Sequence, residues 1–320
     1  MTPRPFVHDH PEFGALLSIV SERQRVAAAL AEKDYWVTHT LWALGEAGLR
    51  LRFKGGTSLS KGFGLIQRFS EDLDVKIEAP DLPDVTSWTS EGVRAIRERE
   101  AFFRALEKRI RVPGAEVVEL PGLRLHAWRG AVFAVHYPGR ASDPLPEGIR
   151  PFIQLEVGSA RVTPGENRPI SSWIHDYLAE ALPDVAAGLI ENRPPAVHCV
   201  RPEVTLLEKA EAICRRFSRD PFEPAGFIRH YEDAARILTS GAIASNDELR
   251  ELLEEMMTKG DIRDWPASDD PALNPASAPT RWAALETAWG AIGPQFWGER
   301  VSLSSCAKEI RDLIRDLAIE

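Results

Sequence analysis

The clearest alternation of apolar and polar residues lies in the segment Asp-Leu-Asp-Val-Lys-Ile-Glu, residues 72–78. Successive side chains of a β-strand point to opposite faces, so the alternation predicts a strand with one apolar and one charged face. Asp72 and Asp74 share the charged face with Lys76, and the two carboxylates are about 6.6 Å apart along the strand. Because strand interiors disfavour aspartate, this pair indicates a functional site, with a solvent-facing edge strand as the alternative.

Periodicity and glycine or proline punctuation predict the remaining elements. Helices are expected at residues 12–47, 57–64, 90–111, 171–182, 203–217, 224–239, 246–258, 280–292 and 303–318. Strands are expected at residues 51–53, 115–120, 130–138 and 151–157. The proline- and aspartate-rich stretch 264–279 is expected to be an exposed loop. The fold predicted is α/β (α+β), with a mixed α/β domain at residues 1–200 followed by a mainly helical domain at residues 201–320.

Composition narrows the class of protein. The 320 residues are 44% hydrophobic and 27% charged, as in globular proteins, and no apolar run is long enough for a transmembrane helix. The three cysteines are scattered, which favours reduced thiols in a cytoplasmic protein over disulfides or a zinc site. A net charge of −9 argues against a general nucleic-acid coat, although local contact with RNA remains open. The many charges of residues 94–111 are expected to form a solvated helix face.

A glycine pair precedes the aspartates. Gly55 and Gly56 lie between a predicted strand and a predicted helix that begins near Thr57 or Ser58. Glycines allow close backbone approach, and a helix start presents free N–H groups, so this turn could hold phosphate. A plain tight turn is the alternative. Hard oxygen ligands beside such a turn suggest Mg²⁺ and a nucleoside triphosphate.

Further candidates are weaker when taken one at a time. Glu156 shares a strand face with Gln154 and would join the aspartates if the two strands were neighbours. Arg68 could neutralise phosphate or form a plain salt bridge, and Ser70 could face phosphate or cap a turn. Lys209 borders an apolar helix stripe and could either snorkel outward or reach a triphosphate. Asp233 could simply pair with His230 on a helix surface.

Four blocks together resemble a known family, the AbiEii/AbiGii-type (MenT-like) nucleotidyltransferase toxins of the polymerase-β-like superfamily. They are Glu32-Lys-Asp-Tyr-Trp36, Phe53-Lys-Gly-Gly-Thr-Ser-Leu59 continuing through Arg68-Phe-Ser-Glu-Asp-Leu-Asp74, Arg201-Pro202 through Thr205-Leu-Leu-Glu-Lys209, and Arg229-His-Tyr-Glu-Asp233. The second block is the specific one, and no resemblance is found beyond residue 240.

The resemblance implies a polymerase-β-like core with a mixed sheet and a Mg²⁺-dependent enzyme that uses a nucleoside triphosphate. It implies metal binding by Asp72 and Asp74, with Glu156 as the third carboxylate, and nucleotide contact by Lys209. It implies roles in the active site for Ser70 and Asp233. Nucleotide binding is assigned to Gly55, Gly56, Thr57, Ser58, Arg68 and Lys209. The helical domain would complete the active-site cleft.

The function that follows is transfer of a nucleotide from a triphosphate to an acceptor, with the 3′ end of tRNA favoured. The resemblance also implies a toxin restrained by a cognate antitoxin protein, and no membrane partner is expected. Two alternatives remain open: nucleotidylation or phosphorylation of a protein, and a non-catalytic module that binds nucleotide or RNA.

Overall fold

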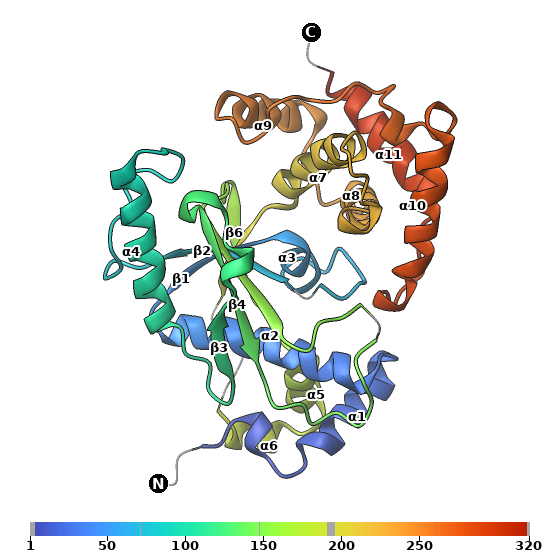
Figure 1. The fold of residues 1–320 in the computed structure, drawn as a ribbon. Coiled ribbons are helices and arrows are strands. Elements are labelled where there is room, and N and C mark those ends of the chain that lie inside the picture. The colour runs from blue at the N-terminus through green and yellow to red at the C-terminus, as the bar shows by residue number, and fades with distance from the viewer. Residues whose placement is uncertain (1–3, 71, 147, 191–195, 319–320) are drawn as a thin grey trace. The chain divides into compact units, whose positions relative to one another are not determined.

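The computed structural model describes residues 4–70, 72–146, 148–190 and 196–318, which form two compact units (Figure 1). Unit 1 comprises Met1–Gly62 and Phe69–Cys199, and it contains the sheet. Unit 2 comprises Phe63–Arg68 and Val200–Glu320 and is mainly helical. No helix among the described residues is both long and apolar enough to cross a membrane.

The sheet of unit 1 is mixed. In chain order its strands are β1 (Arg50–Lys54), β2 (Asp72–Glu78), β3 (Glu116–Glu119), β4 (Gly130–His136), β5 (Ile153–Gly158), β6 (Gly165–Arg168) and β7 (Val197–Val200). Their order in the sheet is β3-β4-β5-β2-β1-β7-β6. The central strand β2 is parallel to β5 and antiparallel to β1. The prediction of an α+β fold with a mixed sheet is confirmed, although β6 and β7 were not predicted.

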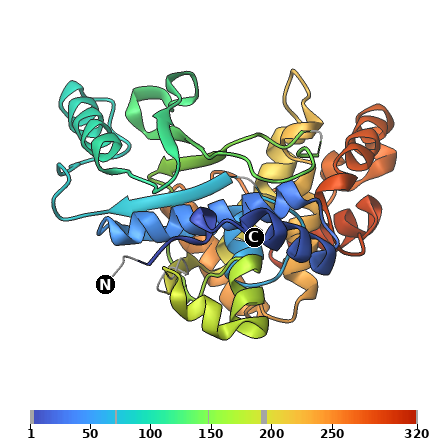
Figure 2. The same ribbon diagram turned by 90° about the horizontal axis from the view of Figure 1, so that it is seen from below.

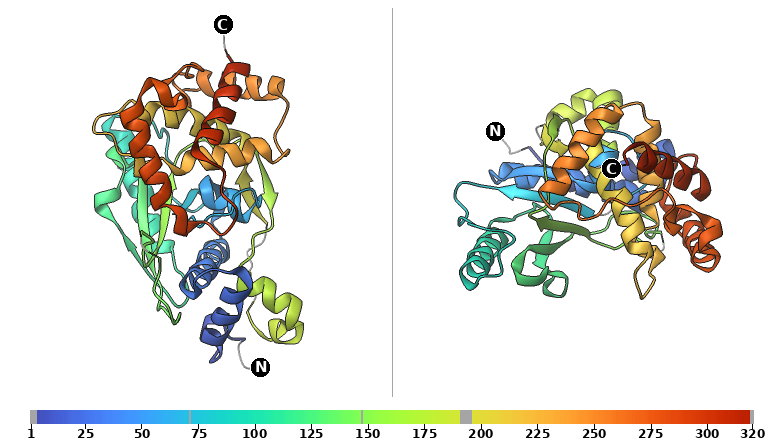
Figure 3. Two further views of the ribbon diagram at one scale, coloured as in Figure 1. Left: turned by 90° about the vertical axis from the view of Figure 1, so that its right-hand side faces the viewer. Right: turned by 90° about the horizontal axis from the view of Figure 1, so that it is seen from above.

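The helices of unit 1 gather mainly beside α2. They are α1 (Phe13–Gln24), α2 (Ala28–Glu46), α3 (Gly55–Lys61), α4 (Val93–Arg109), α5 (Trp173–Ala181) and α6 (Pro183–Gly188). Helix α2 packs against β1 and β5, while α1 and α5 pack against α2. Helix α4 lies on the other side of β2 from α2 (Figures 2 and 3).

The single helix predicted at residues 12–47 is wrong, because the chain forms α1 and α2 with a break between them. Arg25 adopts the left-handed conformation (φ 57°), and its N–H donates to carbonyls of the last turn of α1. This geometry ends a helix even though the apolar periodicity continues. The helix predicted at residues 57–64 also begins earlier than expected, at Gly55.

Helix α2 buries three consecutive charged residues, Glu32, Lys33 and Asp34. Neighbouring residues of a helix point about 100° apart, so the three side chains leave α2 in three directions. The Glu32 carboxylate accepts hydrogen bonds of 2.9 Å from the backbone N–H groups of Arg140 and Ala141. Residues 28–41 of α2 are all buried, so every side of this part of the helix is covered by protein.

The other two charges hold further segments. The Lys33 ammonium donates to the carbonyl of Arg150. Asp34 forms an ion pair with Lys61 of α3 and accepts from the Trp173 N–H at the start of α5, at 2.8 Å. Helix α2 thus fixes the positions of α3, of α5 and of the segment before β5.

Unit 2 is built around α8. Its helices are α7 (Pro202–Phe217), α8 (Arg229–Thr239), α9 (Asn246–Thr258), α10 (Pro279–Ala291) and α11 (Leu303–Asp316). Helices α7 and α11 pack against α8 (Figure 1). The helix predicted at residues 224–239 is shorter than expected, because a 3₁₀ turn at Pro224–Gly226 precedes α8.

The exposed loop predicted at residues 264–279 is wrong in part. Ala272 and Leu273 are buried in a 3₁₀ turn that contacts α7 and α11. The Tyr231 hydroxyl donates to the Ala272 carbonyl at 2.8 Å. Prolines and aspartates occur throughout this stretch, but Ala272 and Leu273 are part of the core of unit 2.

The segment Phe63–Arg68 belongs to unit 2 although it precedes β2 in the sequence. The N–H of Trp297 donates to the Gln67 carbonyl at 3.1 Å, and Arg68 forms an isolated β-bridge with Phe296. Gly298 leaves room for Gln67, because a Cβ at Gly298 would lie only 1.7 Å from the Gln67 side-chain oxygen.

Arg99 corrects the expectation of a wholly solvated face on α4. Its side chain is fully buried. Its guanidinium donates to three backbone carbonyls, those of Ser87 (2.6 Å), Ser90 (2.9 Å) and Ala127 (2.8 Å). Arg99 therefore joins α4 to the segments before and after it.

Replacing Arg99 should destabilise the fold, because three carbonyls would lose a buried donor. We expect Arg99→Ala to lower the free energy of unfolding by about 3 kcal/mol, measured by urea denaturation. The matched control is Arg97→Ala, which removes an exposed arginine from the same helix and should change stability little. Equal stability of the two variants would contradict the structural role of Arg99.

Candidate active site

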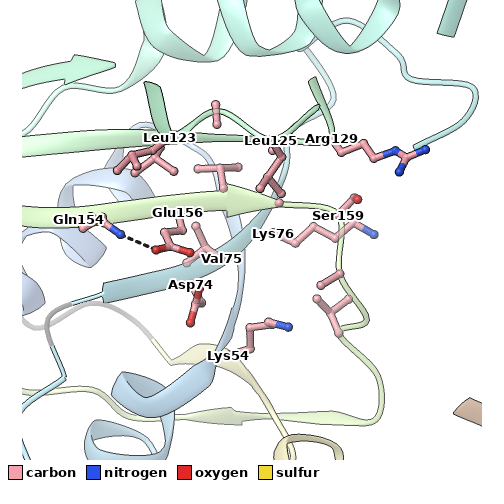
Figure 4. A pocket seen from close by; sticks show the side chains of 17 residues that line it. Lys54, Asp74, Val75, Lys76, Leu123, Leu125, Arg129, Gln154, Glu156 and Ser159 are labelled. Atoms are coloured by element: carbon pink, nitrogen blue, oxygen red, sulfur yellow. Dashed lines mark hydrogen bonds between the residues drawn. The ribbon is translucent and has the colours of Figure 1, made fainter. Parts of the chain in front are cut away.

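Two carboxylates meet at the centre of the sheet. Strands β2 and β5 are parallel neighbours, and Asp74 lies directly opposite Glu156 in their register. Both side chains line one cavity of unit 1, with Lys54 beside Asp74 (Figure 4). The side-chain amide of Gln154 donates to Glu156. The neighbouring strands that were needed to bring Glu156 to the aspartates are therefore present.

The environment of Asp74 favours its neutral form. Loss of hydration, the charge of Glu156 and a hydrogen bond with Glu156 together raise the pKa of Asp74 to about 7, against the opposing effect of Lys54. A carboxyl with this pKa exchanges its proton near neutral pH, which suits a group in acid–base chemistry.

The glycine turn touches this carboxyl pair. Gly55 has φ +79°, and a Cβ added there would lie 2.2 Å from an oxygen of Asp74. The position thus requires glycine both for its backbone conformation and for space. The Thr57 hydroxyl contacts the carbonyls of Ser70 (3.1 Å) and Asp72 (2.6 Å), which holds α3 against the start of β2. Gly56 and Ser58 are buried in the same helix.

Asp72 has a different partner from Asp74. An oxygen of Asp72 accepts from the Arg150 guanidinium at 2.9 Å. The backbone of Arg150 is held in turn by the buried Lys33 through its carbonyl. Sequence analysis missed Lys33 and Arg150 as residues near the site, because only the three-dimensional structure brings them to β2.

The three carboxylates were predicted to bind metal together. Asp74 and Glu156 supply the oxygen ligands that Mg²⁺ prefers, and a divalent cation between them would relieve their repulsion. Asp72 is engaged by Arg150. Within the described part of the chain, no three histidine, cysteine or acidic side chains are arranged to hold a metal ion. The residues fit Mg²⁺ in donor type, and the complete three-carboxylate site stays a prediction.

A second cluster of predicted residues lies inside unit 2. Both carboxylate oxygens of Asp233 accept from Arg68, at 2.8 and 2.7 Å. The Lys209 ammonium is 2.9 Å from Asp233 and 3.2 Å from Nδ1 of His230. The structure therefore brings Arg68, Lys209 and Asp233 together. Lys209 is buried and does not snorkel outward, and His230 contacts Lys209 at this point.

In this cluster the negative charge of Asp233 is offset by the positive charges of Arg68 and Lys209. Burial alone would raise the pKa of Asp233, but Arg68 and Lys209 outweigh it and hold that pKa far below its usual range. Burial lowers the pKa of Lys209, and Asp233 opposes this shift. Burial, followed by the charge of Lys209, lowers the pKa of His230 well below its ordinary value. His230 is therefore neutral and can accept a hydrogen bond from Lys209.

The motif residues thus form two groups, one in each unit. A family model described as nucleotidyl transferase AbiEii toxin, Type IV TA system, matches residues 40–295, which is most of the chain. The chain belongs to the AbiEii nucleotidyl transferase toxin family. The resemblance inferred from the four sequence blocks is confirmed. No curated protein matches the chain.

Membership of the AbiEii family supplies context for both groups. The family is one of nucleotidyl transferase toxins. A carboxyl pair that can bind Mg²⁺ and a glycine turn that can hold phosphate are consistent with nucleotidyl transfer. The individual roles of Ser70, Lys209 and Asp233 stay predictions. The structure adds Gln154 and His230 as contacts of predicted residues.

The raised pKa of Asp74 predicts that stability depends on pH. Its ordinary value is 3.8 and its folded value is about 7, so the folded state binds more protons between these two values. The contribution of Asp74 to the free energy of unfolding should therefore fall as the pH rises from about 4 to about 7 in the absence of divalent cations, whereas the lowered pKa values of His39 and His230 act in the opposite direction.

The measurement is urea denaturation in EDTA across this pH range. Asp74→Asn should remove most of the contribution of Asp74, because an amide does not ionise. Asp84→Asn, at an exposed aspartate of the same unit, should leave the pH dependence as in the unaltered protein. An unchanged slope in the Asp74 variant would contradict the assignment.

The close approach of Gly55 to Asp74 gives another prediction. Gly55→Ala should lower the free energy of unfolding by about 1–2 kcal/mol from its left-handed backbone alone, and it should displace the Asp74 carboxylate. Gly45→Ala is the control, because a Cβ there meets nothing within 4 Å. Urea denaturation of both variants tests the idea, and wild-type stability of the Gly55 variant would argue against it.

Proposed function

We propose that this protein is the nucleotidyltransferase toxin of a type IV toxin–antitoxin system. It would transfer a nucleoside monophosphate from a triphosphate to the 3′ hydroxyl of an RNA, with tRNA as the favoured acceptor. The observation that carries the proposal is the placement of Asp74 and Glu156 on adjacent strands beside the Gly55 turn. Membership of the AbiEii family supports it.

In the proposed reaction, the acceptor oxygen attacks the α-phosphorus of the triphosphate. The new oxygen–phosphorus bond forms as the bond from the α-phosphorus to the bridging oxygen of the β-phosphate breaks, and pyrophosphate leaves. The proton of the attacking hydroxyl would pass to the Asp74–Glu156 carboxyl pair, in which Gln154 orients Glu156. The turn from Gly55 to Ser58 would hold the triphosphate through backbone N–H groups.

Mg²⁺ is part of the proposal. Asp74 and Glu156, with Asp72 once it is released from Arg150, would hold it, and it would offset the negative charge of the phosphates. Lys209 would contact the nucleotide. Asp233 would act as a positioning residue, because it already binds Lys209 and Arg68. Ser70 lies between Arg68 and Asp72 in the sequence, and its carbonyl is fixed by Thr57.

The test is incubation with each α-labelled nucleoside triphosphate, Mg²⁺ and total tRNA. We expect label in RNA from the unaltered protein and loss of at least about 100-fold in rate for Asp74→Asn. Glu78→Gln is the matched control, because Glu78 lies on the same strand and pairs with Arg52 at its surface. That variant should transfer nucleotide at the wild-type rate, and EDTA should abolish transfer.

Three outcomes would reject parts of this assignment. Label on protein in place of RNA would make the acceptor a protein. Nucleotide binding with no product under any condition would make the chain a non-catalytic module. Normal activity of Asp74→Asn would remove the carboxyl pair from the chemistry. The predicted antitoxin can be sought as the product of the neighbouring gene that neutralises growth arrest when both are expressed.

A further inference from the structure

The cavity that holds the carboxyl pair extends well beyond it. Its volume is about 580 Å³, within the range of small-molecule sites. On the side away from Lys54, its wall is apolar and includes Leu123 and Leu125 (Figure 4). Three cationic side chains, Lys54, Lys76 and Arg129, line the same cavity. The proposed chemistry of the carboxyl pair does not account for this apolar wall.

The two leucines are unusual for a folded chain. Leu123 is 50% exposed and Leu125 is 56% exposed, although both line a cavity. Uncovered apolar surface bordered by charged groups is typical of a place where a ligand binds. Of the described residues, none forms an ion pair with Lys76, so its ammonium is available to a ligand.

The segment that carries these leucines is held in a fixed conformation. Ala127 and Trp128 have positive φ angles of 55° and 56°, which is rare for residues other than glycine. The buried Arg99 donates to the Ala127 carbonyl, and the guanidinium of Arg124 lies 3.6 Å from the centre of the Trp128 ring. Strained backbone held in this way is common at binding sites.

Leu125 is also positioned against the sheet. Its N–H donates to the Gly130 carbonyl at 3.0 Å, and a Cβ at Gly130 would come within 2.9 Å of the Leu125 side chain. Gly130 therefore gives Leu125 the space to lie over β4. The apolar wall is part of the fold and not an unstructured loop.

The position of the apolar wall relative to the carboxyl pair indicates which of the two substrates binds there. In an in-line displacement, the attacking oxygen approaches the phosphorus from the side opposite to the leaving group. The turn from Gly55 to Ser58 is proposed above to hold the triphosphate, and with it the pyrophosphate that leaves. The attacking acceptor then lies on the other side of the carboxyl pair, which is the side of Leu123 and Leu125.

We propose that Leu123 and Leu125 form the subsite for the 3′-terminal base of a single-stranded RNA acceptor, with Lys76 and Arg129 beside its phosphates. This inference rests on the proposed function and deepens it. Apolar side chains cover a base face without selecting one sequence, and cationic side chains follow a phosphodiester backbone. Lys76 and Arg129, of which Arg129 also pairs with Glu91, favour RNA over a protein acceptor at this wall.

The test separates acceptor binding from nucleotide binding. The double variant Leu123→Ser/Leu125→Ser should raise the KM for a short single-stranded RNA with a free 3′ hydroxyl by about tenfold or more. The KM for the triphosphate should not change. Fluorescence anisotropy with the same labelled RNA, without triphosphate, should show weaker binding by a similar factor. Lys76→Gln should lessen the salt dependence of that binding.

Leu182→Ser is the matched control, because Leu182 is another exposed leucine of unit 1, at 39% exposure, and does not line the cavity. It should bind and label RNA as the unaltered protein does. Thermal unfolding of all variants checks that the exposed substitutions leave the fold intact.

The possible failures are distinct. If the unaltered protein labels RNA and the double variant does so with the same KM, the subsite is wrong and the proposed function stands. If the KM for the triphosphate rises in place of that for RNA, the wall binds the incoming nucleotide and the inference is overturned. If the unaltered protein labels only protein, or neither binds nor labels RNA, the subsite falls together with the RNA acceptor.

Discussion

The arrangement of unit 1 depends on the burial of three adjacent charges in helix α2. An ionised side chain inside a protein is costly unless it is fully paired, and Glu32, Lys33 and Asp34 are each paired with a different segment. Their partners are backbone N–H groups at residues 140–141, the carbonyl of Arg150, and Lys61 with the Trp173 N–H. Because leaving any one of these charges without its partner is unfavourable, the pairs select one arrangement of the surrounding segments.

That selection reaches the candidate active site. Lys61 is the last residue of α3, so its ion pair with Asp34 fixes the helix that begins with the Gly55 turn. Lys33 fixes the backbone of Arg150, whose side chain pairs with Asp72. The carboxylates of β2 are thus given unlike surroundings: Asp72 faces a guanidinium, and Asp74 faces another acid. When two carboxyl groups of one site have different surroundings, their pKa values differ, and they can take different roles in a reaction.

The part of this site that the sequence predicts is the part set by short-range geometry. A period of two places Asp72 and Asp74 on one strand face, and the same period places Gln154 and Glu156 on another. The parallel pairing of β2 with β5 then brings the two faces together. The family resemblance added Lys209 and Asp233, for which spacing alone favoured surface positions.

The residues that sequence analysis missed act over long separations. Arg99 binds a carbonyl 28 residues away, and Lys33 binds one 117 residues away. Nothing in the local pattern of a helix distinguishes a buried arginine from its solvated neighbours, because the acceptors lie elsewhere in the chain. The break at Arg25 was missed for a different reason: a left-handed residue ends α1 without a glycine or proline to mark it.

The net charge of −9 illustrates the same difference between local and global properties. Charges separated by more than about 8–10 Å are largely screened at physiological ionic strength, so distant acids contribute little to the potential inside a cavity. Many acids of this chain also pair with a nearby arginine or lysine, as Glu232 does with Arg300. Lys54, Lys76 and Arg129 line the same cavity as Asp74 and Glu156, and Asp74 is partly neutral at pH 7. A chain that is acidic overall can therefore present cationic side chains to a phosphodiester beside an apolar wall.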